Sequence, residues 1–240
     1  MAARAQQLAP GWLTGSEQAR LAALQQLARR QEFIACRYAL RHLLATGSST
    51  PAEHWRLDAP EGRAPQLNAD HHGVDAAAST HLSLSHSGAY LACAVGSQPV
   101  GVDLEVKDLR AGRRDVLALA GMACTPGELG QLQALDEGPA RYRHFLQLWS
   151  LKEAYFKCTG TGVDFSVIRR IECRPAGQGD DEAQVLAHAR AWHGVMAGGH
   201  EVMLSVCVLG AGGVPPCSLQ VDADVAWHGE GGWRLVALEN

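Results

Sequence analysis

Apolar residues with helical spacing mark the first structured part of the chain. Residues 14–17 read Thr-Gly-Ser-Glu, which is a capping box, and Leu13 before it can act as a hydrophobic staple. Leu21, Leu24 and Leu27 then follow at helical spacing, and Phe33, Leu40 and Leu44 extend the pattern. Gly47 supplies a stop signal. The pattern predicts a continuous helical region from about residue 14 to residue 46.

A second helical region begins with another capping box, at residues 125–128, with proline in the first helical position. Gly138-Pro139 interrupts it, and a longer helix is predicted from about residue 140 to residue 159. Its apolar positions are Phe145, Leu148, Trp149 and Phe156, and it stops at Gly160.

Strands are predicted after each helical region. Residues 82–85, 90–95 and 99–105 alternate or form short apolar runs separated by turn residues, which is typical of an antiparallel meander. Further strands are predicted near residues 167–173, 184–187, 202–209 and 233–238. The backbone of residues 48–78 is predicted to be mostly irregular. Helices followed by strands, twice over, predict an α+β protein of two similar halves, 1–100 and 101–240.

Composition and charge exclude several classes of protein. The 240 residues are 47% hydrophobic and carry a formal net charge of −4, which disfavours a nucleic-acid-binding surface. The seven cysteines form no C-x-x-C pair, and several lie inside apolar runs, so small buried hydrophobes are expected. The first residues lack the apolar run of a signal peptide, and no window approaches a membrane span. We expect a cytoplasmic protein with no nucleic acid or membrane as partner.

Asp103 and Glu105 are the first candidates for chemistry. Residues two apart on a strand point to the same face, about 6.6–7 Å apart, so these two carboxylates can share one divalent cation. Oxygen ligands suit Mg²⁺, which retains waters and bridges to substrate phosphates. The alternative is the solvated face of an amphipathic strand.

The predicted long helix contains the second candidate group. Glu153 and Lys157 are four residues apart on one helical face, and Lys152 is rotated by about 100° from Glu153. Such a group can bind a metal or accept a proton beside ammonium groups that meet phosphate oxygens. It can equally be an exposed ion pair that stabilises the helix by about 0.2–0.5 kcal/mol.

Ser85 and His86 lie at a predicted strand end before a glycine turn, a position that suits either a phosphate ligand or a turn residue. No G-x-S-x-G sequence surrounds them, so a hydrolase elbow is not indicated.

Together these motifs resemble the signatures of 4'-phosphopantetheinyl transferases. The carrying segments are Gly101-Val102-Asp103-Leu104-Glu105 and, about 45 residues later, the Trp-Ser-Leu-Lys-Glu-Ala-Tyr-Phe-Lys of residues 149–157. Residues 83–88 match the family's histidine segment, and Gly62-Arg63-Ala64-Pro65 is similar to its Gly-Lys-Pro element, with arginine for lysine and an added alanine. The length resembles the single-chain type associated with surfactin synthetase.

The resemblance implies a pseudo-dimer of two α/β halves, each a helix-covered, mainly antiparallel sheet, active as a monomer. It implies an enzyme that moves the phosphopantetheine arm of coenzyme A to a serine of an apo acyl, peptidyl or polyketide carrier protein, releasing adenosine 3',5'-bisphosphate. Asp103, Glu105 and Glu153 would hold Mg²⁺, with Mn²⁺ as an alternative ion.

The resemblance also implies roles for single residues. Glu153, directly or through a metal-bound water, is the candidate base, and Lys157 would stabilise or protonate the leaving phosphate. The side chains implied to contact the phosphates of coenzyme A are Ser85, His86, Lys152, Lys157, Arg63 and Arg37. The region of Met122 and the helix with Leu129 and Leu132 are expected to contact the carrier, whereas the capping-box position of Glu128 favours a structural role.

Two other functions fit part of the sequence. A metal-dependent nuclease or phosphodiesterase could use the same acidic residues and lysine, although it would need a basic groove that the net charge of −4 disfavours. A non-catalytic binder of coenzyme A or carrier proteins would not require the acidic residues.

Overall fold

The computed structural model describes residues 11–107, 115–177, 185–210, 212–214, 216–221 and 223–238. The chain forms two compact units, the first made of Met1–Leu84 and Cys93–Val100, the second of Ser85–Ala92 and Gly101–Asn240. Helices and antiparallel sheets occur together, which confirms the predicted α+β class. The chain passes between the units three times, and residues 85–92 belong with the second unit.

The first unit begins with two helices, α2 (Gly15–Ala23) and α3 (Leu27–Ala45). The capping box forms as predicted, since Thr14 Oγ1 accepts from Glu17 N and Glu17 Oε2 accepts from Thr14 N. The predicted helical region is divided into two helices, because Leu24 has extended backbone angles. The Arg30 side chain donates to the Leu21 carbonyl at 2.7 Å across this break, so helical apolar spacing continues through an interrupted backbone.

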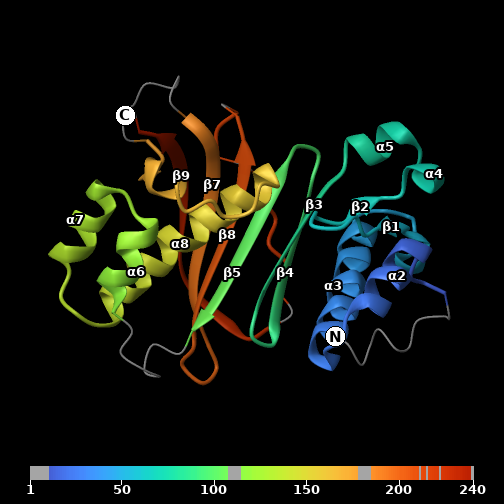
Figure 1. Ribbon diagram of the computed structural model, residues 1–240, viewed down its shortest axis with the longest axis horizontal. Coiled ribbons are helices and arrows are strands. Elements are labelled where there is room, and N and C mark those ends of the chain that lie inside the picture. Colours follow the sequence, from blue (N-terminus) through green and yellow to red (C-terminus); the bar gives the residue numbers. More distant parts are fainter. Residues whose placement is uncertain are drawn as a thin grey trace. The chain divides into compact units, whose positions relative to one another are not determined.

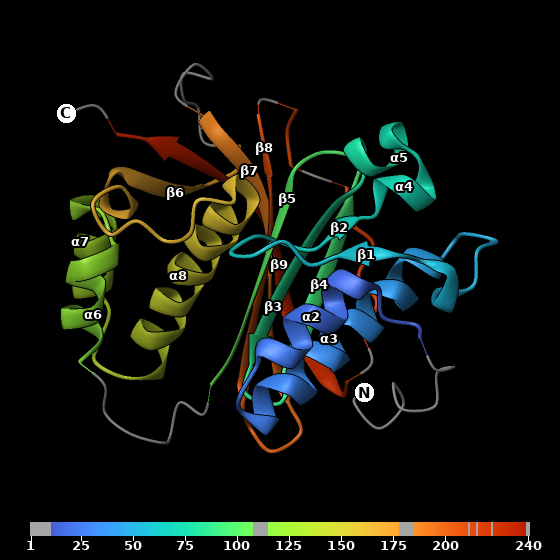
Figure 2. The same ribbon diagram turned by 45° about the vertical axis from the view of Figure 1, so that its right-hand side comes forward.

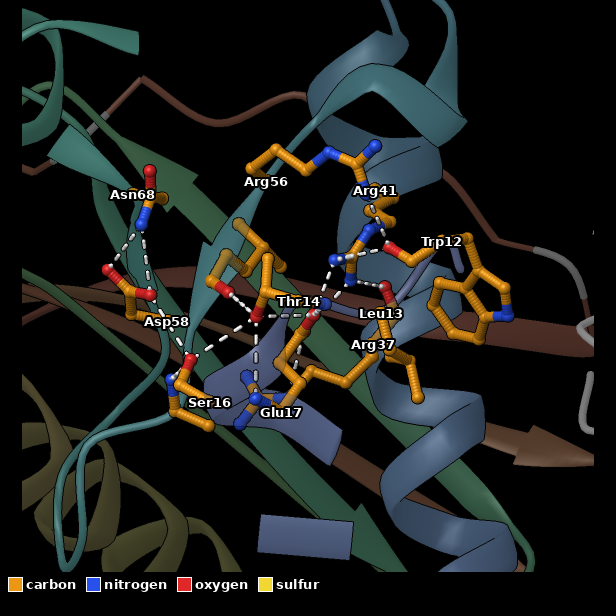
Figure 3. A network of polar contacts seen from close by, with 12 residues as sticks. Trp12, Leu13, Thr14, Ser16, Glu17, Arg37, Arg41, Arg56, Asp58 and Asn68 are labelled. Carbon is orange, nitrogen blue, oxygen red and sulfur yellow. Dashed lines mark hydrogen bonds and ion pairs between the residues drawn. The ribbon is translucent and has the colours of Figure 1, made fainter. Parts of the chain in front are cut away.

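A buried ion pair ties these two helices together (Figure 3). The Glu17 carboxylate accepts from the Arg41 guanidinium at 2.6 Å and 3.0 Å, and neither side chain is exposed. Arg41 also lies over the Trp12 ring. Glu17, the glutamate of the α2 capping box, is therefore also the counter-ion of Arg41 in α3.

Short elements occupy residues 52–78, where the sequence predicts mostly irregular backbone. They are η1 (Ala52–His54), the antiparallel pair β1 (Leu57–Asp58) and β2 (Gln66–Leu67), α4 (Ala69–His72) and α5 (Val74–Ala78). The hairpin β3 (His81–Ser87) and β4 (Tyr90–Gly96) follows. The core of this unit is made of leucines, namely Leu40, Leu44, Leu57, Leu67 and Leu82.

The second unit contains a five-stranded antiparallel sheet with the order β5-β8-β7-β9-β6 (Figure 1). The strands are β5 (Val100–Lys107), β6 (Ile171–Pro175), β7 (Val185–Met196), β8 (Glu201–Leu209) and β9 (Val225–Ala237). The predicted three-strand meander is wrong in its last member, because β5 is an edge strand of this sheet and β3 pairs with β4 alone.

Strands β7 and β9 are much longer than the sequence predicts. The predicted start of β7 at Gln184 lies outside the described residues, and the strand continues to Met196. In β9, Gly229, Gly231 and Gly232 weaken the strand pattern, yet the backbone pairs with β7 throughout their length. Cross-strand pairing thus overrides weak local preference.

Three helices, α6 (Val116–Ala123), α7 (Pro126–Ala134) and α8 (Pro139–Thr159), accompany the sheet. Helix α8 runs along the sheet against β8, and α6 and α7 lie on its far side (Figures 1 and 2). The capping box of α7 and the left-handed Gly160 after α8 confirm the predicted boundaries. None of the described helices could span a lipid bilayer.

Gly101 lets β5 approach α8 closely. A Cβ atom at this position would lie 1.9 Å from the Ala154 carbonyl oxygen and 2.5 Å from Cys158 N. The face of β5 that carries Gly101, Asp103 and Glu105 is therefore covered by α8. This packing places the two predicted acidic residues beside the predicted long helix.

Candidate active site

Asp103 lies inside the second unit and not on a solvated strand face. Its side chain is 5% exposed, and its Oδ1 accepts from Lys157 Nζ at 2.7 Å and from Ser85 Oγ at 3.0 Å. Its Oδ2 is buried and has no hydrogen-bond partner among the described residues. The alternative of a solvated amphipathic strand is wrong here, because α8 covers this face of β5.

Glu105 is held from two sides. The Trp149 indole N–H donates to Oε1 at 3.1 Å, and Lys107 Nζ lies 2.7 Å from Oε2. The sequence predicts Trp149 as an apolar position of the helix. Its indole nitrogen in addition donates the hydrogen bond to Glu105. Because a half-buried indole N–H needs an acceptor, a tryptophan facing an acidic strand was the sequence signal for the contact.

Lys157 lies closer to Asp103 than to Glu153, its neighbour on the same helix. Its Nζ lies 2.7 Å from Asp103 Oδ1 but 3.9 Å from Glu153 Oε2. The spacing of four residues along the helix predicts an ion pair between Glu153 and Lys157. Tertiary packing places Lys157 closer to Asp103.

Glu153 is a carboxylate in an unfavourable environment. Burial, and next the negative charge of Asp103, raise its pKa above the ordinary glutamate value, with Glu105 acting in the same direction and Lys157 against it. The charges of Asp103 and Glu105 thus both act on Glu153. We call these three carboxylates together with Lys157 the acid site.

The acid site has features that suit a divalent cation. Asp103 Oδ2 is a buried oxygen without a hydrogen bond among the described residues, and burial together with the charges of Asp103 and Glu105 raises the pKa of Glu153. Oxygen ligands of this kind are those of Mg²⁺. Within the described ranges no three His, Cys, Asp or Glu side chains converge as a ready-made metal centre, and the Lys157 ammonium supplies the nearest positive charge to Asp103.

Ser85 and His86 are placed differently from each other on β3. The Ser85 hydroxyl is buried and contacts Asp103 Oδ1 and Lys157 Nζ, so it serves the acid site instead of a coenzyme A phosphate. His86 is exposed, and its role as a phosphate ligand stays a prediction.

Lys152 does not reach a phosphate, which corrects the prediction for this residue. Its side chain is fully buried, and its Nζ donates to Glu128 Oε2 at 2.6 Å, the Ala123 carbonyl at 2.8 Å and the Ile168 carbonyl at 3.2 Å. All three ammonium protons are thereby used. The helical step of about 100° that separates Lys152 from Glu153 directs one side chain into the core and the other to the acid site.

Glu128 is structural, as its position predicts. Besides Lys152 it accepts from Thr125 N and Cys173 N, both at 2.8 Å. Leu132 is also fully buried, so its predicted contact with a carrier protein is wrong, while Leu129 is partly buried and Met122 is 53% exposed.

Arg37 and Arg63 belong to the first unit. Arg37 is buried, lies 3.6 Å from Glu17 Oε1 and 4.6 Å from the Phe33 ring centroid, and has two nitrogens without hydrogen-bond partners among the described residues. Burial lowers its pKa, although Glu17 opposes the shift. Arg63 is exposed in the turn between β1 and β2.

Comparison with known proteins agrees with this geometry. The profile of the 4'-phosphopantetheinyl transferase superfamily matches residues 99–207, a segment that contains the whole acid site. Residues 99–207 are therefore similar to this superfamily.

Individual transferases match parts of the chain. A 4'-phosphopantetheinyl transferase of Bacillus subtilis is 36% identical over 83 residues, 35% of this chain and 34% of the relative. A putative 4'-phosphopantetheinyl transferase of Synechocystis is 32% identical over 161 residues, 65% of this chain and 61% of the relative. The transferase Sfp of Bacillus subtilis is 34% identical over 84 residues, 35% of this chain and 34% of Sfp. The chain thus aligns with about a third to three fifths of these transferases.

Proposed function

We propose that this protein transfers the 4'-phosphopantetheine arm of coenzyme A to a serine of an apo carrier protein. The observation that carries the proposal is the buried contact between Asp103 and Lys157 beside Glu153, inside the segment shared with the transferase superfamily. The relatives are named as a 4'-phosphopantetheinyl transferase and a putative 4'-phosphopantetheinyl transferase.

The chemistry is a substitution at phosphorus. The carrier serine oxygen forms a bond to the phosphorus that bears the pantetheine arm, and the bond from that phosphorus to the bridging pyrophosphate oxygen breaks. The serine proton passes to Glu153, and adenosine 3',5'-bisphosphate leaves. Since phosphoryl transfer needs positioning and charge neutralisation above all, the Lys157 ammonium suits the leaving phosphate.

Glu153 is suited to take the proton. Its raised pKa brings the carboxylate closer to the range in which it can accept and hold a proton near neutral pH. Burial and Asp103 cause that rise, so Asp103 tunes the base as well as binding Lys157.

Asp103, Glu105 and Glu153 would hold a divalent cation, Mg²⁺ or Mn²⁺. Such an ion neutralises charge on pyrophosphate oxygens when it is bound. The exposed His86 and Arg63 are proposed to contact phosphates of coenzyme A, as is Arg37, whose Nη1 has no hydrogen-bond partner among the described residues.

The test is incubation with a panel of apo acyl, peptidyl and polyketide carriers, coenzyme A and Mg²⁺, read by mass spectrometry. We expect a mass gain of one phosphopantetheine arm, and a loss of about 100-fold or more in rate for Glu153→Gln. Ser205→Ala, which removes a buried hydroxyl outside the acid site, is the matched control. Cleavage of plasmid DNA that disappears in Asp103→Asn, without carrier modification, would instead support the phosphodiesterase alternative.

A further inference from the structure

Strand β5 has an edge that no strand of its own sheet covers. It stands at one end of the order β5-β8-β7-β9-β6, so its second row of amide groups needs other acceptors. Two serines of β3 provide them. Ser85 Oγ accepts from Leu104 N at 3.1 Å, and Ser87 Oγ accepts from Val106 N at 3.0 Å. Each contact joins residues 19 apart, so the two strand segments run side by side in register.

The same hydroxyls meet the two acids of β5. Ser85 Oγ donates to Asp103 Oδ1 at 3.0 Å, and Ser87 Oγ lies 3.5 Å from Glu105 Oε2. Both contacts join residues 18 apart. Because strand side chains repeat every two residues, serines two apart on β3 match carboxylates two apart on β5.

The Ser85 hydroxyl is fully committed to these contacts. It donates its single proton to Asp103 and accepts from Leu104 N and Lys157 Nζ, the latter at 2.8 Å. A hydroxyl has one donor and two acceptor sites, so all three are used. Ser85 and Ser87 are both buried, which separates them from the exposed His86 between them.

We propose that Ser85 and Ser87, the serine pair, are positioning residues that hold Asp103 and Glu105 at the spacing and orientation needed to bind a divalent cation. The proposal rests on the cation site of the proposed function, not on the carrier that the enzyme serves. Partners that orient metal-binding carboxylates commonly change metal affinity 10–100-fold when they are removed.

The test is Mn²⁺ binding to the full chain, measured by electron paramagnetic resonance titration without other substrates. We expect Ser85→Ala to weaken Mn²⁺ binding by about 10-fold or more. Ser87→Ala, which removes a longer carboxylate contact, is expected to produce a smaller loss in the same direction. Ser85→Thr and Ser87→Thr retain the hydroxyl on a strand-compatible side chain and are expected to restore binding.

Ser205→Ala is the matched control, because the Ser205 hydroxyl bonds to Ser150 at 3.0 Å and is buried in the same unit. It is expected to bind Mn²⁺ as the wild type does. Circular dichroism checks that each variant is folded, and Ser87→Ala provides the result if Ser85→Ala does not fold. Wild-type affinity in both alanine variants, an equal loss in Ser205→Ala, or a wild type that does not bind Mn²⁺ would overturn the proposal.

Carrier modification, assayed in parallel, separates this proposal from the proposed function. Serine-dependent Mn²⁺ binding without modification of any carrier would support the positioning role and contradict the transferase activity. Carrier modification with unchanged Mn²⁺ affinity in the alanine variants would do the reverse.

Discussion

Lys152 Nζ lies 2.6 Å from Glu128 Oε2, and neither side chain is exposed to solvent. Removing one member of such a pair leaves the other charge buried without a partner. We expect Lys152→Ala to lower the free energy of unfolding by about 3–5 kcal/mol, measured by urea denaturation.

The surface pair of Arg29 and Glu32 is the control for this substitution. Its nitrogen–oxygen distance is 3.1 Å, but the two side chains are 55% and 32% exposed. Arg29→Ala is expected to cost less than about 1 kcal/mol. A loss in Lys152→Ala no larger than that of Arg29→Ala would contradict the structural role of Lys152.

A methyl group at Gly101 would separate β5 from α8. The atoms that it would meet are backbone atoms of Ala154 and Cys158, which cannot rotate away. We expect Gly101→Ala to cost about 3 kcal/mol or more in thermal or urea unfolding and to abolish transfer.

Gly121 offers the opposite case within the same unit. It lies in α6 with open space around the position of a Cβ atom, so Gly121→Ala is expected to be neutral or to stabilise by up to about 1 kcal/mol. Equal tolerance of alanine at Gly101 and Gly121 would show that β5 and α8 are not in close contact.

Glu201 is expected to make stability depend on acid pH. Burial raises its pKa, but hydrogen bonds from Arg143 and His193 and their charges outweigh burial, so the net shift is downward. In the window between the lowered pKa and the ordinary glutamate value, the unfolded chain binds more protons, and stability falls as pH falls. Glu201→Gln should therefore be less stable than the wild type at neutral pH, with a difference that shrinks as pH drops through that window.

Glu153 supplies a comparison of opposite sign in buffer that contains EDTA. Its pKa is raised, so the folded state binds more protons than the unfolded chain between the ordinary and raised values, and stability falls as pH rises there. Glu153→Gln should gain stability relative to the wild type as pH rises. The same pH trend in both variants would contradict these opposite shifts.

Most thiols are expected to react slowly in the native protein. Burial raises the pKa of Cys36 to about 11 and that of Cys124 to about 12, and Cys158, Cys173 and Cys207 are also buried. In an Ellman assay we expect seven reactive thiols in guanidinium, but early reaction in the native state only at the partly exposed Cys217, because burial strongly raises the pKa of Cys93 as well. Rapid native labelling of four or more thiols would contradict the described packing.

Local signals in the sequence predict the helices of the second unit well. The capping box at Thr125 and the stop at Gly160 depend on neighbouring residues, so the sequence marks the ends of α7 and α8. The spacing of Asp103 and Glu105 likewise places both carboxylates on one strand face.

Burial of those residues could not be predicted from spacing. Periodicity gives the angle between Lys152 and Glu153 but not which of them faces the core, and only packing against α6, α7 and η2 (Ile168–Arg170) decides that. Asp103 is buried for a similar reason, since α8 covers the polar face of β5. The contacts of Ser85 and Ser87 with β5 depend on the register between β3 and β5. Because these strands belong to different sheets, the sequence pattern does not give that register.

The position of residues 85–92 in the second unit means that no uninterrupted stretch of chain after residue 100 contains all of that unit. A fragment that begins at Gly101 would keep Asp103, Glu105, Glu153 and Lys157 but lose both hydroxyls that bind the free edge of β5. Lys157 lies 72 residues after Ser85 in the chain. During synthesis, the contact between them can form only after Lys157 has been added. Contacts this distant along the chain slow folding, so the acid site is expected to be among the last regions to become ordered.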